Sequence, residues 1–446
     1  MALLFVILWL CTAVHYSKCN EPNDHMDKHD EFLFTAFPES ILSFPIHTKD
    51  IQQQTTQVPN KMKCVFACVE VPWCQSMNFQ TTAKNNGLHV CELLSTDKHT
   101  HPQNMTRNDT FTHFSIKTPC EQQPCLNGGT CILQNNRQEY RCSCKKGFDG
   151  NSCQNGPPPI NITFTNLGAT GRFGPTSIGS HYDGQSHEGQ VTLLSGIQIW
   201  RVPLTWSYRI EAVGASGGYD DSQNSRLYRG RGARMIGTFQ LLEGELIKIL
   251  VGQEGGINTV SKSSGGGGGS FVVKNDSTPL IVAGGGAGIE FAKQRHSRGD
   301  ASVSTSGNQG HGGSEWAGGI NGYGATVADR RSNSGGGGGG FYSSGRSGYH
   351  YGGSGRGGEG GKGFLKGGAG GRSYKNSVPG GFGGGGGAYG NGGGAGGGGG
   401  YSGGASGDDN ADSSGGGGGS FNIGTDQSNT CCYNGMGHGY VIITNF

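Results

Sequence analysis

The sequence lacks the features of several protein classes. Its 34 Lys and Arg nearly balance its 32 Asp and Glu, and a formal net charge of +2 provides no basic field for nucleic acid. Beyond the first residues, no apolar run approaches the roughly 20 residues of a membrane helix. There is no Gly-Lys-Ser/Thr phosphate loop and no nucleophile–base–acid constellation. We therefore predict a protein with no nucleic-acid partner, no membrane span, no cofactor and no enzymatic activity.

The N-terminus carries a short apolar run at residues 3–14. The run is too short to span a bilayer, and its position is typical of a secretory signal peptide, although no Lys or Arg precedes it. We assign residues 1–19 to the signal peptide, with cleavage between residues 17 and 19. The remaining chain is expected to be secreted and extracellular.

Fourteen cysteines in a secreted chain predict disulfides. Cys11 leaves with the signal peptide, and the fate of Cys19 is open. The other twelve form a group of four, a group of six and an adjacent pair. Four Asn-x-Ser/Thr sequons fit the same oxidising route, and they begin at Asn104, Asn108, Asn161 and Asn275.

The group of four cysteines marks a small N-terminal domain. Cys64 and Cys68 are four residues apart, so a helix would set both thiols on one face, toward strand-like segments at 31–37 and 111–117. The spacing C-x3-C-x5-C-x-S, followed by C-x-L, resembles the PAN/apple family. An unrelated small domain held by four cysteines is the alternative. The resemblance implies an α+β module that binds proteins or carbohydrates, with the pairs Cys64–Cys91 and Cys68–Cys74.

The group of six cysteines has the spacing C-x4-C-x5-C-x10-C-x-C-x8-C, which resembles an EGF-like module. Such a small unit cannot bury enough apolar surface alone, so disulfides replace a core. Thr118 and Pro119 directly precede the first cysteine, where calcium-binding members of the family have acidic residues, so we predict no bound calcium. Thr130 stands at the family's O-fucose position, with an ordinary turn threonine as the alternative. The resemblance implies a spacer module with the pairs Cys120–Cys131, Cys125–Cys142 and Cys144–Cys153.

Glycine is scarce at first and then dominates. Only six of the 89 glycines precede residue 160, and nearly one residue in three is glycine after it. Segments of strand composition, such as 246–251 and 440–443, separate the glycine runs. These segments favour a β-sandwich over a flexible linker, and the absence of a Gly-X-Y register excludes collagen. The runs lie at 265–269, 335–340, 383–387, 396–400 and 415–419.

A packed fold for these runs exists in principle. In an extended helix with three residues per turn, every N–H and C=O points outward, and parallel or antiparallel copies can bond laterally. Several runs can satisfy one another's backbone groups, whereas one run could not. The number of runs is therefore meaningful, because it makes a packed fold possible where one run alone would not.

The segments between the runs carry a further resemblance. Gly196-Ile-Gln-Ile-Trp-Arg-Val-Pro, Pro279-Leu-Ile-Val-Ala-Gly-Gly-Gly and neighbouring stretches follow one another as in the glycine-rich ligand-binding domain of anaplastic lymphoma kinase and leukocyte tyrosine kinase receptors. This resemblance covers 161–446 and implies a TNF-like β-sandwich with a polyglycine-helix bundle that binds small basic cytokines. Leu167 stands where the receptors have a cysteine. The chain has no kinase segment, so the receptors' catalytic function is not carried over.

One site is carried over from the same resemblance. In the receptors, a tyrosine and an acidic segment beside a glycine run contact the ligand, and Tyr401 followed by Asp408, Asp409 and Asp412 stands in that position here. Three carboxylates on a rigid platform would steer a basic partner. A solvated acidic loop is the alternative.

Three weaker signals remain. Arg298-Gly299-Asp300 matches the integrin-binding tripeptide and is a candidate adhesion site, with a chance match as the alternative. Cys431 and Cys432 are expected to bond to each other, although a bond to another chain is also open. No framework completes a metal site around two histidine pairs, and we predict none; the pairs are His25 with His29 and His99 with His101.

Together these observations predict a mainly β, multidomain protein. Its function is expected to be that of a secreted binding protein that resembles the ectodomain of a receptor tyrosine kinase and binds an extracellular, basic, cytokine-like protein. The N-terminal module would add carbohydrate or matrix contacts. The alternatives are a structural glycine-rich matrix, mucus or adhesion protein and a fragment of a full receptor. The predicted domains are the signal peptide (1–19), PAN/apple-like (20–117), EGF-like (118–154), linker (155–160) and glycine-rich (161–446) segments.

Overall fold

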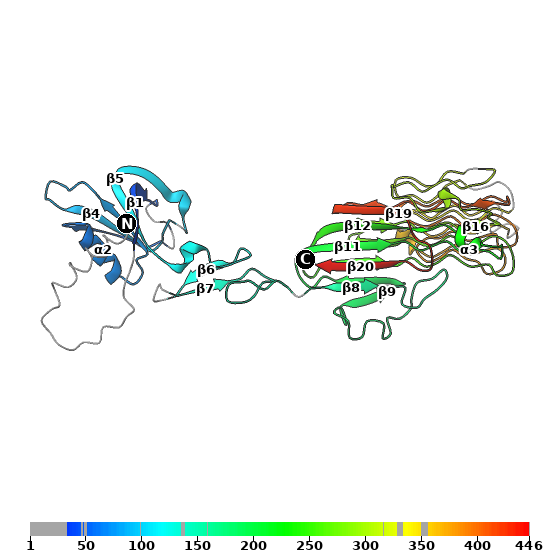
Figure 1. The fold of residues 1–446 in the computed structure, drawn as a ribbon, viewed down its shortest axis with the longest axis horizontal. Coiled ribbons are helices and arrows are strands. Elements are labelled where there is room, and N and C mark those ends of the chain that lie inside the picture. Colours follow the sequence, from blue (N-terminus) through cyan, green and yellow to red (C-terminus); the bar gives the residue numbers. More distant parts are fainter. Residues whose placement is uncertain are drawn as a thin grey trace. The chain divides into compact units, whose positions relative to one another are not determined.

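The structure, a computed structural model, divides the chain into two compact units, residues 1–157 and 158–446 (Figure 1). Each unit has its own hydrophobic core. The signal peptide, Cys19, His25, His29 and His99 lie outside the described residues. The structure describes residues 34–45, 48, 51–98, 100–134, 139–157, 159–314, 316–327, 333–348 and 356–445.

The first unit contains a five-stranded antiparallel sheet, β1-β5-β3-β4-β2, with helix α2 packed on it. The Asn60 side chain caps α2 by accepting a hydrogen bond from the Lys63 N–H at 3.0 Å. The buried face of α2 carries Cys64 and Cys68, which join the core. The elements are β1 Phe34–Leu42, β2 Gln53–Val58, α2 Lys61–Glu70, β3 Ser76–Gln80, β4 His89–Leu94, η1 Pro102–Asn104 and β5 Met105–Ile116.

Five disulfides hold the modules of this unit. Two lie in the sheet-and-helix module, and one of them ties α2 to β4. The other three surround the short hairpin of β6 (Thr130–Leu133) and β7 (Tyr140–Ser143), which follows η2 (Pro119–Gln122). All five pairs are those that the two resemblances imply: Cys64–Cys91, Cys68–Cys74, Cys120–Cys131, Cys125–Cys142 and Cys144–Cys153.

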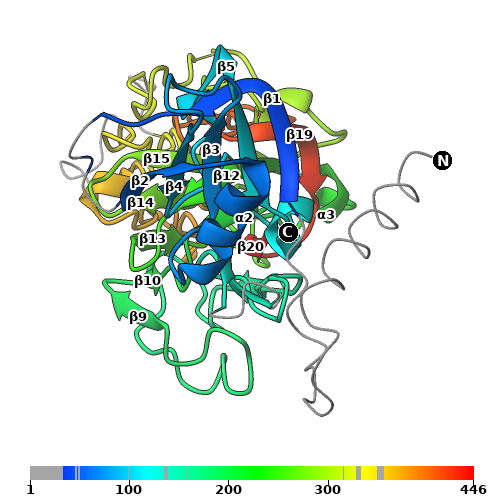
Figure 2. The same ribbon diagram turned by 90° about the vertical axis from the view of Figure 1, so that its left-hand side faces the viewer.

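The second unit is a sandwich of two antiparallel sheets, ordered β18-β15-β14-β13-β10-β9 and β19-β12-β11-β20-β8 (Figure 1). Figure 2 shows β13, β14 and β15 side by side in the first of them. Alternate residues point into the core, where Trp200 of β10 meets Tyr208 of β11 edge to face at 5.8 Å between ring centroids. The strands are β8 Asn161–Phe164, β9 Val191–Leu194, β10 Ile197–Arg201, β11 Trp206–Val213, β12 Gly232–Leu241, β13 Leu246–Leu250, β14 Ser270–Lys274, β15 Pro279–Ala283, β18 Phe421–Asn422, β19 Thr425–Asn434 and β20 Tyr440–Asn445.

The glycine runs form a bundle of helices with three residues per turn. Gly396 and Gly399 donate their N–H groups to one neighbouring segment, at the carbonyls of Ser264 and Gly267 (3.0 and 2.9 Å). The two glycines between them donate to two other runs. This period of three is that of an extended polyproline-type helix, in which backbone groups point in three directions. The predicted fold class, mainly β with a polyglycine bundle, is confirmed.

The bundle leaves no room for side chains at its centre. A Cβ atom added to Gly266 would lie within 3.0 Å of the backbone of Gly397, and one added to Gly417 would meet the backbone of Asp300 as closely. The Cα hydrogens instead face carbonyl oxygens, a weak additional attraction. The saturated backbone hydrogen bonds offset the large entropy that glycine loses on folding.

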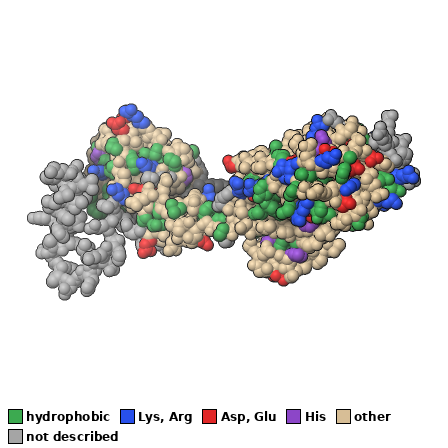
Figure 3. Space-filling model, turned by 45° about the vertical axis from the view of Figure 1, so that its right-hand side comes forward, with side chains coloured by type: hydrophobic (Ala, Val, Ile, Leu, Met, Phe, Trp, Pro, Cys, Tyr) green, Lys and Arg blue, Asp and Glu red, His purple; other side chains and the backbone are tan. Residues whose placement is uncertain are grey.

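Short elements complete this unit. They are α3 Ser225–Tyr228, the paired strands β16 Ile289–Glu290 and β17 Ser413–Ser414, η3 Ser297–Gly299 and η4 Phe364–Lys366. Charges of both signs are spread over the face of the unit seen in Figure 3. In the described ranges, no helix is both long and apolar enough to cross a bilayer.

Candidate binding surfaces of the glycine-rich unit

Tyr401 and Asp408 lie at opposite ends of one glycine segment. Gly404 and Gly407 both donate to the same antiparallel neighbour, at Gly398 and Ala395, so the segment keeps its period of three. At about 3.1 Å per residue, the Cα atoms of Tyr401 and Asp408 are roughly 22 Å apart. The single predicted site is therefore two separate surfaces.

The Tyr401 end is aromatic. The Tyr401 ring stacks on Phe421 with 4.4 Å between centroids and lies 6.2 Å from Phe341. Burial, followed by the neighbouring Tyr342, raises the pKa of Tyr401 above its ordinary value. Tyr342 and Tyr323 are exposed, with their rings 5.7 Å apart. Tyr401 therefore packs at this end of the glycine bundle, and Tyr323 and Tyr342 form its exposed aromatic surface.

The opposite end gathers carboxyl groups, and we name Asp220, Glu290, Asp408, Asp409 and Asp412 the carboxylate end. Glu290 of β16 is only 5 % exposed. Burial, followed by the charges of Asp409, Asp408 and Asp220, raises the pKa of Glu290 to about 9. Glu290 is therefore protonated at neutral pH, because burial and then the nearby carboxylates disfavour its charged form.

Asp408 does not belong to an exposed patch, and that part of the prediction is wrong. Its side chain is 4 % exposed. Its Oδ2 accepts hydrogen bonds from the Ser314 N–H (2.7 Å) and the Asn410 amide (2.9 Å), while its Oδ1 has no partner among the described residues. The carboxylate is enclosed because it caps backbone groups of a loop that covers the end of the glycine run.

Asp409 and Asp412 remain partly exposed. Asp409 accepts a hydrogen bond from the Asn333 amide at 2.7 Å. Asp412 accepts one from the Lys293 N–H at 2.8 Å and lies 3.0 Å from His296 Nε2. Although burial acts to raise it, these hydrogen bonds lower the pKa of Asp412 below its ordinary value. Asp412 is therefore charged at neutral pH. In the described ranges, no His, Cys, Asp and Glu group has the arrangement of a metal site.

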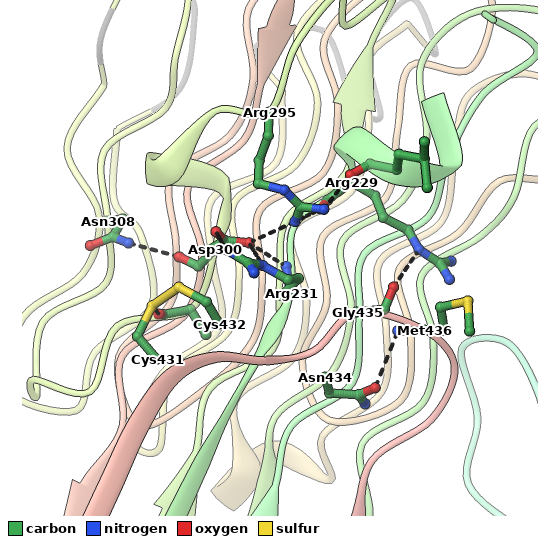
Figure 4. Close-up of polar contacts among 12 residues, drawn as sticks. Arg229, Arg231, Arg295, Asp300, Asn308, Cys431, Cys432, Asn434, Gly435 and Met436 are labelled. Atoms are coloured by element: carbon green, nitrogen blue, oxygen red, sulfur yellow. Dashed lines mark hydrogen bonds and ion pairs between the residues drawn. A yellow bond between two sulfur atoms is a disulfide. The ribbon is translucent and has the colours of Figure 1, made fainter. Parts of the chain in front are cut away.

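The Arg298-Gly299-Asp300 tripeptide buries its acidic residue, which contradicts the adhesion prediction. Asp300 is 1 % exposed. Its carboxylate accepts from the Arg231 backbone N–H (2.8 Å) and from Arg231 Nη2 (2.7 Å), and it lies 3.6 Å from Arg295 Nη1 (Figure 4). A partner would reach this carboxylate only by breaking two ion pairs. The sequence of the tripeptide does not indicate this burial, because the partners of Asp300, Arg231 and Arg295, lie outside the tripeptide.

Cys431 and Cys432 form a disulfide with each other within an irregular part of β19. Gly232 and Arg234 of β12, two residues apart, pair with Asn434 and Thr430 of β19, which are four residues apart. The edge strand β19 therefore forms a bulge at this point. Cys432 has a positive φ of 67°, and Cys431 Sγ lies 3.2 Å from the Ala301 carbonyl oxygen. The disulfide thus lies beside the buried Asp300 and its arginine partners (Figure 4).

The predicted modification sites differ in accessibility. Asn161, Asn275 and Thr130 are exposed. Asn104 and Asn108 are half-buried, and the Asn104 amide donates to a backbone carbonyl at 3.1 Å. Glycosylation at all five residues stays a prediction.

Comparisons with known proteins support the two N-terminal modules. The PAN domain family matches residues 38–118, and the EGF-like domain family matches residues 120–152. The leukocyte tyrosine kinase receptor of Mus musculus is 43 % identical over 97 residues, which are 21 % of this chain and 11 % of the receptor. Neurogenic locus notch homolog protein 1 of Xenopus laevis is 46 % identical over 52 residues, 11 % of this chain and 2 % of that protein. The chain thus spans only a small part of these relatives. It contains a PAN domain followed by an EGF-like domain.

Proposed function

We propose that this protein is secreted and binds a small basic, cytokine-like protein through the carboxylate end of its glycine-rich unit. The observation that carries the proposal is the convergence of Asp220, Glu290, Asp408 and Asp409 at one end of the bundle, where burial and then the neighbouring charges raise the pKa of Glu290. Asp409 is one of the charges that act on Glu290, and both Asp409 and Asp412 remain partly exposed, within reach of a partner. Such a potential speeds encounter with a basic protein and orients it.

The remaining features agree with a binding role. PAN and EGF-like modules are extracellular-type domains, and the partial likeness to a receptor tyrosine kinase supports recognition of a protein ligand. We propose no enzymatic activity, because the carboxylates at this end are engaged in hydrogen bonds that hold the fold. Assignment of residues 161–446 to the receptors' ligand-binding domain is part of this proposal. So are the carbohydrate or matrix contacts of the PAN domain.

Neutralising Asp409 and Asp412 together is expected to weaken binding of a basic partner about tenfold, with a flatter salt dependence, because Asn keeps the hydrogen-bond acceptors but removes the charge. The measurement is surface plasmon resonance of the full chain against a basic protein captured from extracellular fluid, at two salt concentrations. Asp183→Asn, an exposed carboxylate in a loop of the same unit, is the control. Asp408 is left intact because it is buried. Unchanged affinity and salt dependence in the double variant would refute the carboxylate end as the binding surface.

A structural matrix role is the second candidate, and the glycine content favours it. Hydrogen exchange separates the two candidates. If the bundle is a folded platform, N–H groups of the runs at 396–400 and 415–419 should exchange at least about 1000-fold more slowly than in the urea-unfolded chain. Uniformly fast exchange across both runs would instead support an extensible matrix and remove the folded platform.

A further inference from the structure

Exposed apolar side chains from two distant segments share one surface of the glycine-rich unit. Leu227 of α3 is 62 % exposed, and Met436, in the turn between β19 and β20, is 65 % exposed. Arg226 joins them, since its Nη2 lies 3.6 Å from Met436 Sδ. We name Arg226, Leu227, Arg295 and Met436 the arginine–methionine surface.

Two guanidinium groups, the buried one of Arg229 and the exposed one of Arg295, hold this surface in place. Arg229 is 1 % exposed, donates from Nε to the Gly435 carbonyl at 3.1 Å and pairs with Glu254. Arg295 donates to the carbonyls of Leu227 and Arg229. These contacts tie α3 to the β19–β20 turn (Figure 4). The apolar side chains are therefore presented by a prearranged backbone, which lowers the entropy cost of binding.

Positive charge is in excess here. In the ion pairs of this region, three arginines (229, 231 and 295) share two acidic partners, Glu254 and Asp300. Arg226 has no carboxylate partner in the described part of the chain. Burial, followed by the charge of Arg231, lowers the pKa of Arg295. The surface is thus opposite in sign to the carboxylate end.

We infer that the arginine–methionine surface binds an acidic protein segment that carries an apolar side chain. Arginine and methionine are enriched in protein interfaces, and methionine adapts to apolar partners. The uncompensated positive charge selects carboxylates on the partner. Leu227 and Met436 favour a protein over a sulfated polysaccharide, which offers them no apolar group. This partner is separate from the basic ligand proposed above, so the inference does not depend on that proposal.

A peptide-display experiment tests the inference directly. A random dodecapeptide library is selected on the full chain, and the most enriched peptide is synthesised and titrated. We expect enriched peptides to combine Asp or Glu with Leu, Phe or Met. We expect Leu227→Ser and Arg226→Ala each to weaken binding of that peptide at least about tenfold. The matched controls Leu194→Ser on β9 and Arg201→Ala on β10, both exposed residues of the other sheet, should bind like the parent chain.

Several results would overturn the inference. One is enrichment of neutral or basic peptides, and another is equal binding by the parent chain, Leu227→Ser and Arg226→Ala. Heparin distinguishes a polysaccharide partner. If no acidic peptide is enriched while heparin binds and is lost in Arg226→Ala but retained in Leu227→Ser, the surface recognises charge alone. All four substituted side chains are exposed, so we expect the variants to keep the melting temperature of the parent chain. With unchanged melting temperatures, a loss of peptide binding reports the surface and not unfolding.

Discussion

Replacing Gly266 by Ala is expected to prevent the glycine-rich unit from folding. The new methyl group would lie within 3.0 Å of the Gly397 backbone, which is itself held by hydrogen bonds to other runs. Neither run can move without disturbing several neighbours, so the cost should exceed about 4 kcal/mol, above that of most core substitutions. Secretion yield and thermal unfolding of the full chain measure the effect.

Gly392→Ala provides the matched control for this substitution. Unlike Gly266, Gly392 has a positive φ, of 65°, and nothing lies within 4 Å of an added Cβ. Its substitution should cost only about 1–2 kcal/mol, the penalty of a left-handed conformation for a residue with a side chain. Equal melting temperatures for the two variants would contradict the packing described for the bundle.

Asp300→Ala is expected to destabilise the glycine-rich unit by about 3–5 kcal/mol, because it leaves the guanidinium groups of Arg231 and Arg295 without their shared buried partner. Denaturant unfolding of the full chain, followed by tryptophan fluorescence, measures the change. Asp183→Ala, at an exposed position, should stay within about 0.5 kcal/mol of the parent.

The same experiment decides the meaning of the Arg298-Gly299-Asp300 tripeptide. A large loss of stability means that Asp300 acts within the fold, and any accompanying loss of cell adhesion would then follow from unfolding. Unchanged stability would show that the carboxylate is not buried in ion pairs. In that case the tripeptide would again be a candidate adhesion site.

Cysteine spacing alone predicted the two N-terminal modules, because these small domains rely on disulfides and their spacing carries the architecture. The helix carrying Cys64 and Cys68 was also predictable, since residues four apart share a helical face. In the glycine-rich unit, apolar segments between the runs indicated strands. The number of runs indicated that they bond laterally, because backbone groups inside a domain must be paired.

Lateral neighbours were not predictable from the sequence. A period of three sets the directions in which N–H groups point, but it does not say which run lies in each direction. Asp408 therefore read as exposed, although a loop contributing Ser314 encloses it. Asp300 read as a free tripeptide residue, although its partner Arg231 lies 69 residues away.

By itself, the sequence determined the module order and a mainly β unit with glycine runs, which follow from local spacing and composition. The disulfide pairs followed from the resemblance of the cysteine spacings to the PAN/apple and EGF-like families. The tertiary structure alone decided that Tyr401 and the carboxylates form separate surfaces, that Asp300 is buried, and that Arg226 meets Met436. The physical reason is that burial and electrostatic potential depend on segments brought together only when the glycine runs pack.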